Sequence, residues 1–301
     1  MVPLSSPRMA LGRRSRAAGF AWVALAYAVA GVAAYGVVRC APVAWPLWRV
    51  VAAADVVATV VVFAFSVVLD NSSVYDPYWS VAPMAIAPAL AAVGEAPLAR
   101  KVMVVALVLA WGARLTYNWA RGWTGLAHED WRYVEQRRHG RAYWPVSFVG
   151  IHMMPTVLVF GGCLSLFPAL VTGTAPLGVL DVAAFAVTAG AIVLEGLADE
   201  QLRAFRLSGP APGTILETGV WAWSRHPNYL GEISVWWGLA LFALAGDRGA
   251  WWCLAGPAAI TLLFTFVSVP LLDKRSLARR PQYAEHMARV PALFPWPRGR
   301  R

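Results

Sequence analysis

Long apolar stretches, separated by short polar segments, set the pattern of this chain. They cover residues Phe20–Val38, Val50–Leu69, Trp79–Val93, Val102–Trp119, Val146–Leu170, Leu177–Leu197, Ile233–Ala245 and Trp251–Leu272. A bilayer needs about 20 apolar residues per helical crossing, and backbone groups in lipid must bond within their own segment, as in a helix. The pattern predicts an all-α polytopic membrane bundle with seven or eight transmembrane helices, since the third and seventh stretches are short.

The composition agrees with this pattern. Only 14% of the 301 residues are charged, against about 25% in an ordinary soluble domain. The mean hydropathy is +0.55. These values exclude a soluble domain, and the high apolar content excludes intrinsic disorder. We therefore expect residues 1–301 to form a single integral membrane domain.

The positive charge of the chain, formally +10, follows the predicted crossings. Arginines are concentrated in the N-terminal residues 1–19, in segments 120–145 and 198–229, and in the tail 273–301. With eight crossings all of these segments lie on one side of the membrane, which the positive-inside rule identifies as the cytoplasm. The pattern predicts cytoplasmic N- and C-termini in a bacterial inner membrane, and it requires no nucleic-acid partner.

The cysteines and histidines predict no metal site. The three cysteines, Cys40, Cys163 and Cys253, are far apart and form no CxxC pair. The five histidines lack the spacing of a di-iron desaturase or an intramembrane zinc protease. The sequence also lacks the motifs of a serine hydrolase, a P-loop NTPase and a soluble dinucleotide-binding domain.

Charged residues inside apolar helices are costly and usually functional, and one set of them begins inside the end of the sixth stretch and continues beyond it. Glu195, Asp199, Arg203 and Arg206 are spaced to share one helix face. A ladder of salt bridges on an exposed helix end accounts for Asp199 and Arg203. It explains Glu195 poorly, because that residue follows the apolar run 189–194. We predict that this face lines a cofactor.

A second set, Arg114, Asn118 and Arg121, shares a helix face with Tyr117. Guanidinium groups at membrane depth suit phosphate better than lipid, because they pair bidentately with phosphate oxygens. The alternative is an aromatic and basic belt at the membrane interface, which explains the nearby tryptophans better than it explains Arg114.

The segment 224–232 is dense in polar residues directly before an apolar helix. Its polar side chains are those of Ser224, Arg225, His226, Asn228, Tyr229 and Glu232. A helix N-terminus with nearby Arg and Asn is suited to an anion. A turn alone could hold one such residue, so we predict that this segment binds a cofactor.

A fourth polar stretch, residues 70–80, lies on the same predicted side of the membrane. Tyr75 and Tyr78 are able to donate a proton, and Asp76 could orient a donor or contact a substrate. An aromatic loop at the membrane interface is an equally good explanation of any one of these residues.

Taken together, these segments resemble a known family. The stretch Arg225–Glu232 resembles the C-terminal domain of the steroid 5-alpha-reductase superfamily, and the likeness extends to residues 194–206 and to the tail 272–296. Residues 71–80 and 125–133 look like the bacterial DUF1295 branch of that superfamily. The resemblance covers the chain from about residue 71 to its end.

The resemblance implies a membrane enzyme that holds NADPH from the cytosolic side and reduces a carbon–carbon double bond conjugated to a ketone. By position, five residues match cofactor-contacting positions of the reductases: Asp199, Arg206, Asn228, Gly231 and Glu232. Glu195 stands where steroid reductases commonly carry Asn. The expected substrate is a small apolar lipid, a sterol or another enone.

The expected chemistry assigns roles to the remaining candidates. Tyr78 and Tyr75 are the candidate proton donors, with Asp76 in support. Arg114, Arg121, Arg203 and Arg206 are expected to share the phosphates of NADPH.

Two other functions stay open from sequence. Isoprenylcysteine carboxyl methyltransferases have a similar Arg-x-Pro-x-Tyr turn and basic tail but use S-adenosylmethionine. A non-enzymatic lipid-binding membrane protein is the other alternative, although it has no need of inward-facing charges.

Overall fold

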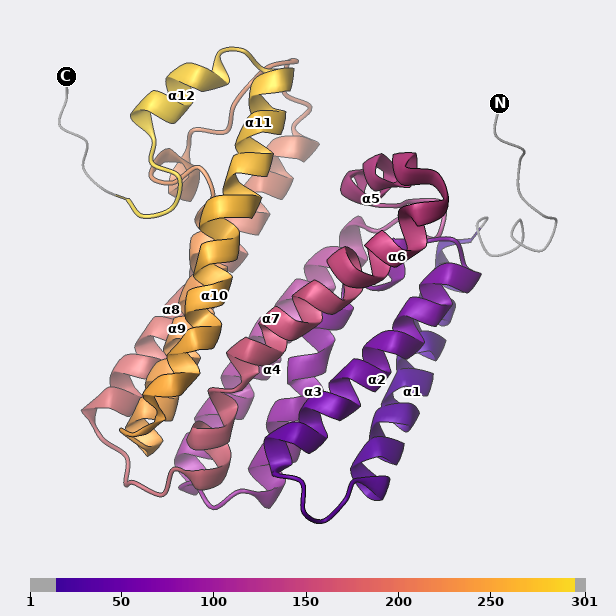
Figure 1. Ribbon diagram of the computed structural model, residues 1–301. Helices are drawn as coiled ribbons and strands as arrows, with labels where there is room; N and C mark the ends of the chain where they lie inside the picture. The colour runs from indigo at the N-terminus through magenta and orange to yellow at the C-terminus, as the bar shows by residue number, and fades with distance from the viewer. Residues whose placement is uncertain (1–14, 296–301) are drawn as a thin grey trace. The chain divides into compact units, whose positions relative to one another are not determined.

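The computed structural model of the protein describes residues 15–295, and every regular element in that range is helical (Figure 1). The α-helices are α1 (Arg16–Cys40), α2 (Leu47–Val68), α3 (Tyr78–Val93), α4 (Leu98–Gly122), α5 (Trp131–Gln136), α6 (Tyr143–Ser147), α7 (Met154–Cys163), α8 (Val179–Leu207), α9 (Pro227–Gly246), α10 (Ala255–Leu263), α11 (Val269–Arg279) and α12 (Tyr283–Arg289). The short 3-10 and π segments are η2 (Ser72–Val74), η3 (Arg137–Ala142), η4 (Phe148–Met153), η5 (Pro168–Thr172), η6 (Gly219–Ala222), η7 (Ala250–Leu254) and η8 (Phe264–Ser268).

Six segments of residues 15–295 are long and apolar enough to cross a membrane. They are Arg16–Cys40, Leu47–Val68, Trp131–Thr172, Val179–Leu207, Pro227–Gly246 and Ala250–Arg279. The all-helical fold and its membrane-spanning character are thereby confirmed. The stretch 233–245, short by sequence, belongs to a 20-residue helix because α9 already begins at Pro227.

Two further helices, α3 and α4, are not among these six. Helix α3 has 16 residues, about 24 Å at 1.5 Å per residue, which is short of a hydrocarbon core about 30 Å thick. Helix α4 has 25 residues but carries Arg100, Lys101, Arg114 and Arg121. The crossings at these two helices stay predictions.

Large apolar side chains cover the outer faces of the spanning helices. Val32, Val68, Val182 and Phe266 are 73%, 73%, 69% and 70% exposed. Soluble proteins rarely expose such surfaces over large contiguous areas, so these faces suit contact with lipid.

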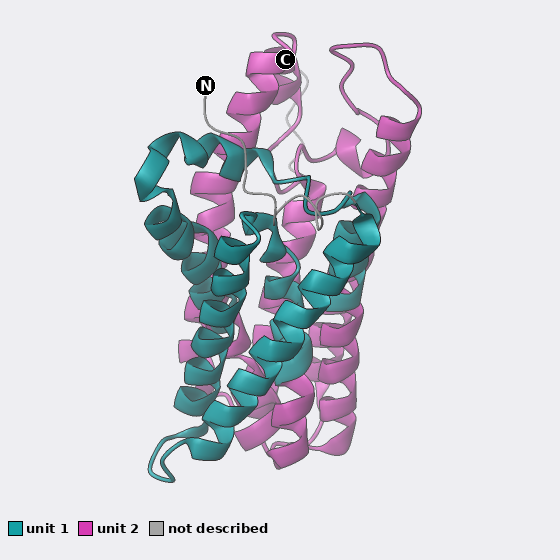
Figure 2. Ribbon diagram, turned by 90° about the vertical axis from the view of Figure 1, so that its right-hand side faces the viewer, with its two compact units in different colours: residues 1–86, 112–160 teal, residues 87–111, 161–301 magenta. Residues whose placement is uncertain are grey.

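The chain divides into two compact units (Figure 2). Unit 1 comprises residues 1–86 and 112–160, and unit 2 comprises residues 87–111 and 161–301. The divisions fall within helices α3, α4 and α7.

In unit 1, α1 packs along α2. Helix α1 begins after Ser15, whose hydroxyl caps it by accepting a hydrogen bond from the backbone N–H of Ala18. Small residues on the two helices, Ala26, Ala30 and Ala58, are buried in a core that also contains Tyr75 and Tyr78. This core therefore surrounds two of the predicted catalytic side chains.

In unit 2, α8 packs closely along α9. The close approach depends on glycines: a β-carbon at Gly238 would lie 2.1 Å from the hydroxyl oxygen of Thr188.

A buried ion pair fixes the start of α8 in this unit. Arg100 is fully buried and donates from Nε and Nη2 to the two carboxylate oxygens of Asp181, at 2.6 and 3.0 Å. Its Nη1 donates to the carbonyls of Gly173 and Ala175 at 3.2 and 3.0 Å. A buried charge is tolerated only when paired and hydrogen-bonded in this way.

Candidate functional site

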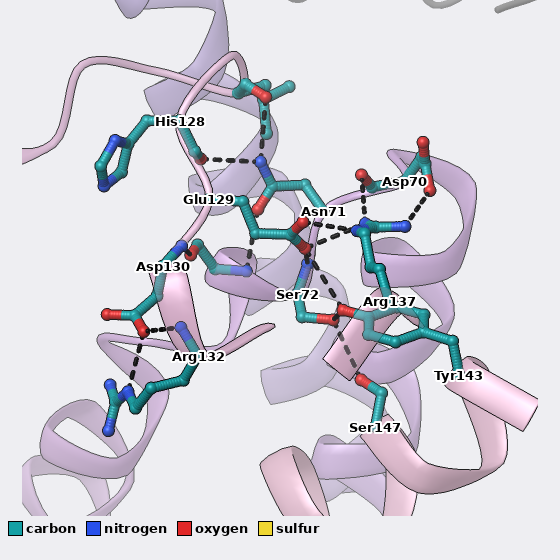
Figure 3. Close-up of polar contacts among 12 residues, drawn as sticks. Asp70, Asn71, Ser72, His128, Glu129, Asp130, Arg132, Arg137, Tyr143 and Ser147 are labelled. Carbon is teal, nitrogen blue, oxygen red and sulfur yellow. Dashed lines mark hydrogen bonds and ion pairs between the residues drawn. The ribbon is translucent and has the colours of Figure 1, made fainter. Parts of the chain in front are cut away.

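Two loops of unit 1 that are distant in sequence are joined by hydrogen bonds (Figure 3). Asn71 precedes η2 and accepts a bond from the backbone N–H of Ser73 at 2.8 Å. Its amide nitrogen donates to the carbonyls of Leu126 and His128, each at 2.9 Å. The Ser73 hydroxyl accepts from the backbone N–H of Asp130 at 2.9 Å. The two sequence segments that carry the DUF1295 resemblance therefore form one loop pair.

Arg137 lies at the centre of the charged part of this loop pair (Figure 3). Its Nε and Nη2 donate to the two carboxylate oxygens of Glu129 at 2.6 and 2.9 Å. Its Nη1 donates to the Asp70 carboxylate at 2.8 Å, and its Nη2 to the Asp70 carbonyl at 2.9 Å. The Asp70 backbone has a φ of 51°, which is uncommon for a non-glycine residue, and these two bonds hold it there.

The Glu129 carboxylate also accepts hydrogen bonds from η2 and from α6. It accepts from the backbone N–H of Ser72 at 2.8 Å and from the Tyr143 hydroxyl at 3.3 Å. The Ser72 hydroxyl bonds in turn to the hydroxyls of Tyr143 and Ser147, at 2.6 and 2.9 Å. A surface pocket of about 420 Å³ opens beside this network. The polar groups of this network are hydrogen-bonded to one another. Their role is to fix the loop that leads to Tyr75 and Tyr78.

Tyr78 is buried and faces an acid that the sequence analysis did not single out. Its hydroxyl donates to Oδ1 of Asp55, on α2, at 2.7 Å, and both side chains are buried. Asp55 is the one acid within the apolar stretch Val50–Leu69. An isolated acid at membrane depth is itself a sign of function, and this signal could have identified it.

Tyr75 points to a different set of partners. Its hydroxyl bonds to that of Thr156 at 2.8 Å, and Thr156 bonds to Thr59 at 2.9 Å. The buried ring of His152 lies 4.8 Å from the Tyr75 ring, between centroids. Burial raises the pKa of the Tyr75 hydroxyl, so this phenol is neutral at physiological pH.

Asp76 supports neither tyrosine by a hydrogen bond. Its carboxylate accepts from the hydroxyl of Tyr133, in α5, at 2.8 Å. Burial raises the pKa of Asp76 to about 7, although the bond from Tyr133 opposes the shift. The three predicted catalytic residues thus have three different sets of hydrogen-bond partners, although the rings of Tyr75 and Tyr78 lie 5.3 Å apart between centroids. Tyr78 alone among them is bonded to an acid.

On α4, Arg121 is bonded to Asn118 within the same helix. Its Nε and Nη2 donate to the amide oxygen of Asn118 at 3.1 and 2.8 Å. Its guanidinium also lies over the Tyr117 ring, 5.3 Å from the centroid. Arg114 stands two turns before Arg121, on the same face of the helix. The predicted one-face arrangement of this set is therefore present.

In unit 2, Glu195 and Gly231 mark the contact between α8 and α9. A β-carbon at position 231 would lie 2.7 Å from Cβ of Glu195 and 3.0 Å from the carbonyl oxygen of Ala191. Glycine at 231 is thus required by helix packing, whatever else it does. The buried Glu232 lies one residue on, and its carboxylate accepts from the indole N–H groups of Trp111 and Trp236, at 2.9 and 2.7 Å.

The polar end of the α8 face lies on its last turns. Asp199, Arg203 and Arg206 are partly or fully exposed there. Asn228 is the second residue of α9 and is half-buried. Between residues 15 and 295, no hydrogen bond or ion pair engages the side chain of Arg203 or Asn228. Tyr229, next in sequence, stacks its ring on that of His226, 5.5 Å between centroids.

Arg225 and His226 are committed to a buried acid that the sequence analysis also missed. Arg225 donates from Nη2 to Oδ2 of Asp273, on α11, at 2.7 Å. Nε2 of His226 lies 2.9 Å from Oδ1 of the same carboxylate, which also accepts from the Tyr283 hydroxyl at 3.0 Å. The density of polar residues made Arg225 and His226 candidate cofactor ligands. The structure pairs both side chains with Asp273, and their contact with a cofactor stays a prediction.

Comparisons with known proteins add a family. The family model described as a protein of unknown function (DUF1295) matches residues 62–290. The uncharacterized protein C594.04c of Schizosaccharomyces pombe is 27% identical over 261 residues, covering 78% of this chain and 76% of its own. No solved structure gives a significant match. The predicted relationship to DUF1295 is confirmed, and the wider relationship to steroid 5-alpha-reductases stays a prediction.

Proposed function

The chain belongs to the DUF1295 family, and we propose that it is a membrane-embedded, NADPH-dependent reductase of a carbon–carbon double bond conjugated to a ketone. The observation that carries this proposal is the buried Tyr78–Asp55 pair, with its 2.7 Å hydrogen bond inside the helices of unit 1. A phenol bonded to a carboxyl group in an apolar interior suits a proton donor.

The chemistry of this reduction needs such a donor. When bound, NADPH supplies the hydride for the β-carbon of the enone. Negative charge then grows on the carbonyl oxygen, and the Tyr78 phenol stabilises it and gives up its proton. Asp55, in its protonated form, returns a proton to the phenolate oxygen. The net reaction consumes one hydride and one proton for each double bond.

Unit 2 carries side chains that fit a phosphate-bearing cofactor. Arg203 and Arg206 lie one turn apart near the end of α8, and guanidinium groups bind phosphate bidentately. Arg203 and Asn228 have no polar partner among residues 15–295, so both are available to a ligand. Arg225 and His226 are not proposed as direct ligands, because Asp273 engages them.

The other predicted ligands keep narrower roles in the proposal. In unit 1, Arg114, Asn118 and Arg121 stay candidate cofactor ligands on one face of α4. In unit 2, Glu195 lies against Gly231, and Asp199 on α8 and Tyr229 and Glu232 on α9 stay candidate cofactor ligands. The contribution of Gly231 is close helix packing.

The proposal also includes the finer topology. Helices α3 and α4 are taken to cross the bilayer with the six long apolar segments, which gives eight crossings and places both termini in the cytoplasm. A bacterial inner membrane is the proposed location. The substrate is an apolar enone lipid, for example a sterol, as in the steroid 5-alpha-reductases that the sequence resembles.

The test is turnover by the purified protein with NADPH and cholest-4-en-3-one as the probe enone. Tyr78→Phe and Asp55→Asn are expected to lower kcat by about 10²–10⁴-fold, the usual size of a general-acid contribution, with NADPH affinity retained. Tyr35→Phe changes an exposed tyrosine of α1 and serves as the matched control. Unchanged kcat in Tyr78→Phe would remove Tyr78 as the donor.

A further inference from the structure

The buried acid Asp273 accepts hydrogen bonds from two other parts of unit 2. Arg225 and His226 reach it from the residues directly before α9, and Tyr283 reaches it from α12. Asp273 itself lies on α11 and is 5% exposed. One carboxylate thus joins the start of α9 to two C-terminal helices.

The segment that follows α11, residues 281–293, is hydrogen-bonded to residues 224–226, directly before α9. We call this segment the C-terminal strap. The backbone N–H groups of Arg225 and His226 donate to the carbonyls of Pro291 and Ala292, at 3.0 and 3.1 Å. The Ser224 hydroxyl donates to the Ala292 carbonyl at 3.0 Å. The strap therefore fixes the backbone of Arg225 and His226. It also shares the Arg225 side chain with Asp273, because Nη1 of Arg225 donates to the carbonyls of Met287 and Val290 at 3.3 and 2.5 Å.

A second set of bonds ties the strap to the segment after α8. His286 and Arg289 of α12 both contact the Glu217 carboxylate at 2.9 Å. The amide nitrogen of Gln282 donates to the carbonyl of Gly213 at 2.7 Å. The strap is thus attached at two places along the segment that joins α8 to α9.

We propose that Asp273 is a positioning residue for the cofactor and that the C-terminal strap forms part of the cofactor site, an inference that rests on the proposed function. Arg225 and His226 directly precede Pro227 and Asn228, the first residues of α9. Asp273 holds those two side chains and the strap holds their backbone. The direction in which Asn228 and Tyr229 leave the turn is therefore set by both.

The charge balance makes Asp273 the critical member. Arg225 is 8% exposed, and a buried guanidinium without its carboxylate is strongly unfavourable. Replacement by Asn keeps the shape of the side chain but removes the charge. The buried Arg225 guanidinium is then left with neutral acceptors only, among them the carbonyls of Met287 and Val290, and its hold on the turn weakens. The expected consequence is a displaced turn and a released strap, with α8 and α9 still paired.

The experiment compares Asp273→Asn with Asp247→Asn, an exposed acid that follows α9 and caps Gly249. We measure hydrogen exchange of residues 224–230 and 281–293, and the Kd of NADPH. With cholest-4-en-3-one as probe, we also measure the KM for NADPH and kcat. Asp273→Asn is expected to raise exchange in both segments and to weaken NADPH binding about tenfold. KM for NADPH rises, while kcat at saturating NADPH changes less than about twofold. Asp247→Asn is expected to match wild type.

Tyr283→Phe removes one hydrogen bond to Asp273 and replaces Asp273→Asn in the experiment if that variant does not fold. It is expected to raise the Kd of NADPH about threefold, because one hydrogen bond of modest net strength is lost. Raised exchange with unchanged Kd and KM would overturn the positioning role and leave the proposed function intact. Absence of NADPH binding by wild type would overturn the proposed function, and the positioning role with it.

Discussion

Replacement of Gly231 by Ala separates helix packing from cofactor contact. The added β-carbon would meet Cβ of Glu195 at 2.7 Å, the carbonyl oxygen of Ala191 at 3.0 Å and the backbone nitrogen of Glu195 at 3.1 Å. Unstrained carbon contacts lie at about 3.5–4.0 Å. Two of the three atoms belong to the backbone of α8, so relief requires movement of a whole helix rather than of one side chain.

Overpacking of this kind costs about 1–3 kcal/mol. For a unit of this size, each kcal/mol lowers the unfolding midpoint by about 2–4 °C, which places the fall for Gly231→Ala near 5 °C. Gly190→Ala, in the middle of α8, is the control, because a β-carbon there has nothing within 4 Å. That change is expected to be neutral or stabilising, by up to about 1 kcal/mol of helix propensity.

Thermal unfolding in detergent, followed by the fluorescence of the 16 tryptophans, measures both variants. A midpoint for Gly231→Ala within about a degree of wild type, below the smallest shift that overpacking allows, would refute the packing argument. If NADPH binding were lost at that unchanged midpoint, Gly231 would instead be a direct cofactor contact.

Two further predictions follow from single contacts. Arg100→Met leaves the buried Asp181 without its ion-pair partner and is expected to lower the free energy of unfolding, measured in SDS, by about 3–5 kcal/mol. The double variant with Asp181→Leu should regain most of this loss. A double variant that regains none of it would contradict the pairing. Burial lowers the pKa of His286, and the positive charges of Arg225 and Arg289 lower it further, whereas Glu217 raises it. The attached strap therefore binds fewer protons than the released one, and attachment weakens as pH falls below about 6.5. Hydrogen exchange of α12, corrected for intrinsic rates, should rise from pH 7.5 to 5.5, and His286→Gln should remove that dependence; a pH-independent wild type would contradict it.

Sequence alone predicted the parts of this protein that depend on local spacing. The apolar stretches correspond to helices, and the i, i+4, i+7 spacing of Arg114, Asn118 and Arg121 places them on one face of α4. The two segments of the DUF1295 resemblance prove to be one loop pair, joined through Asn71 and Ser73.

The missing parts depend on partners that are distant in the chain. Asp55 and Tyr78 are 23 positions apart, and Arg225 and Asp273 are 48 apart. Helical periodicity relates residues within one element and carries no information about which helices pack together. For this reason the density of polar residues around Arg225 suggested a ligand, whereas the structure supplies an acid from α11.

The start of α9 also shows why a single residue can fit two roles in sequence. Gly231 matches a cofactor-contacting position by resemblance, and it is also a point of close approach between α8 and α9. Both roles demand the absence of a side chain, so only the packing distances separate them.

The central claim, that the protein binds NADPH through the end of α8 and the start of α9, is tested most directly by equilibrium binding to the purified protein in detergent. We expect saturable binding of NADPH, no binding of S-adenosylmethionine, and weaker NADPH binding by about tenfold or more in Arg206→Ala and Asn228→Ala, each the loss of a charged or polar contact to the ligand. Saturable binding of S-adenosylmethionine without NADPH, or NADPH affinity unchanged in both variants, would contradict the account.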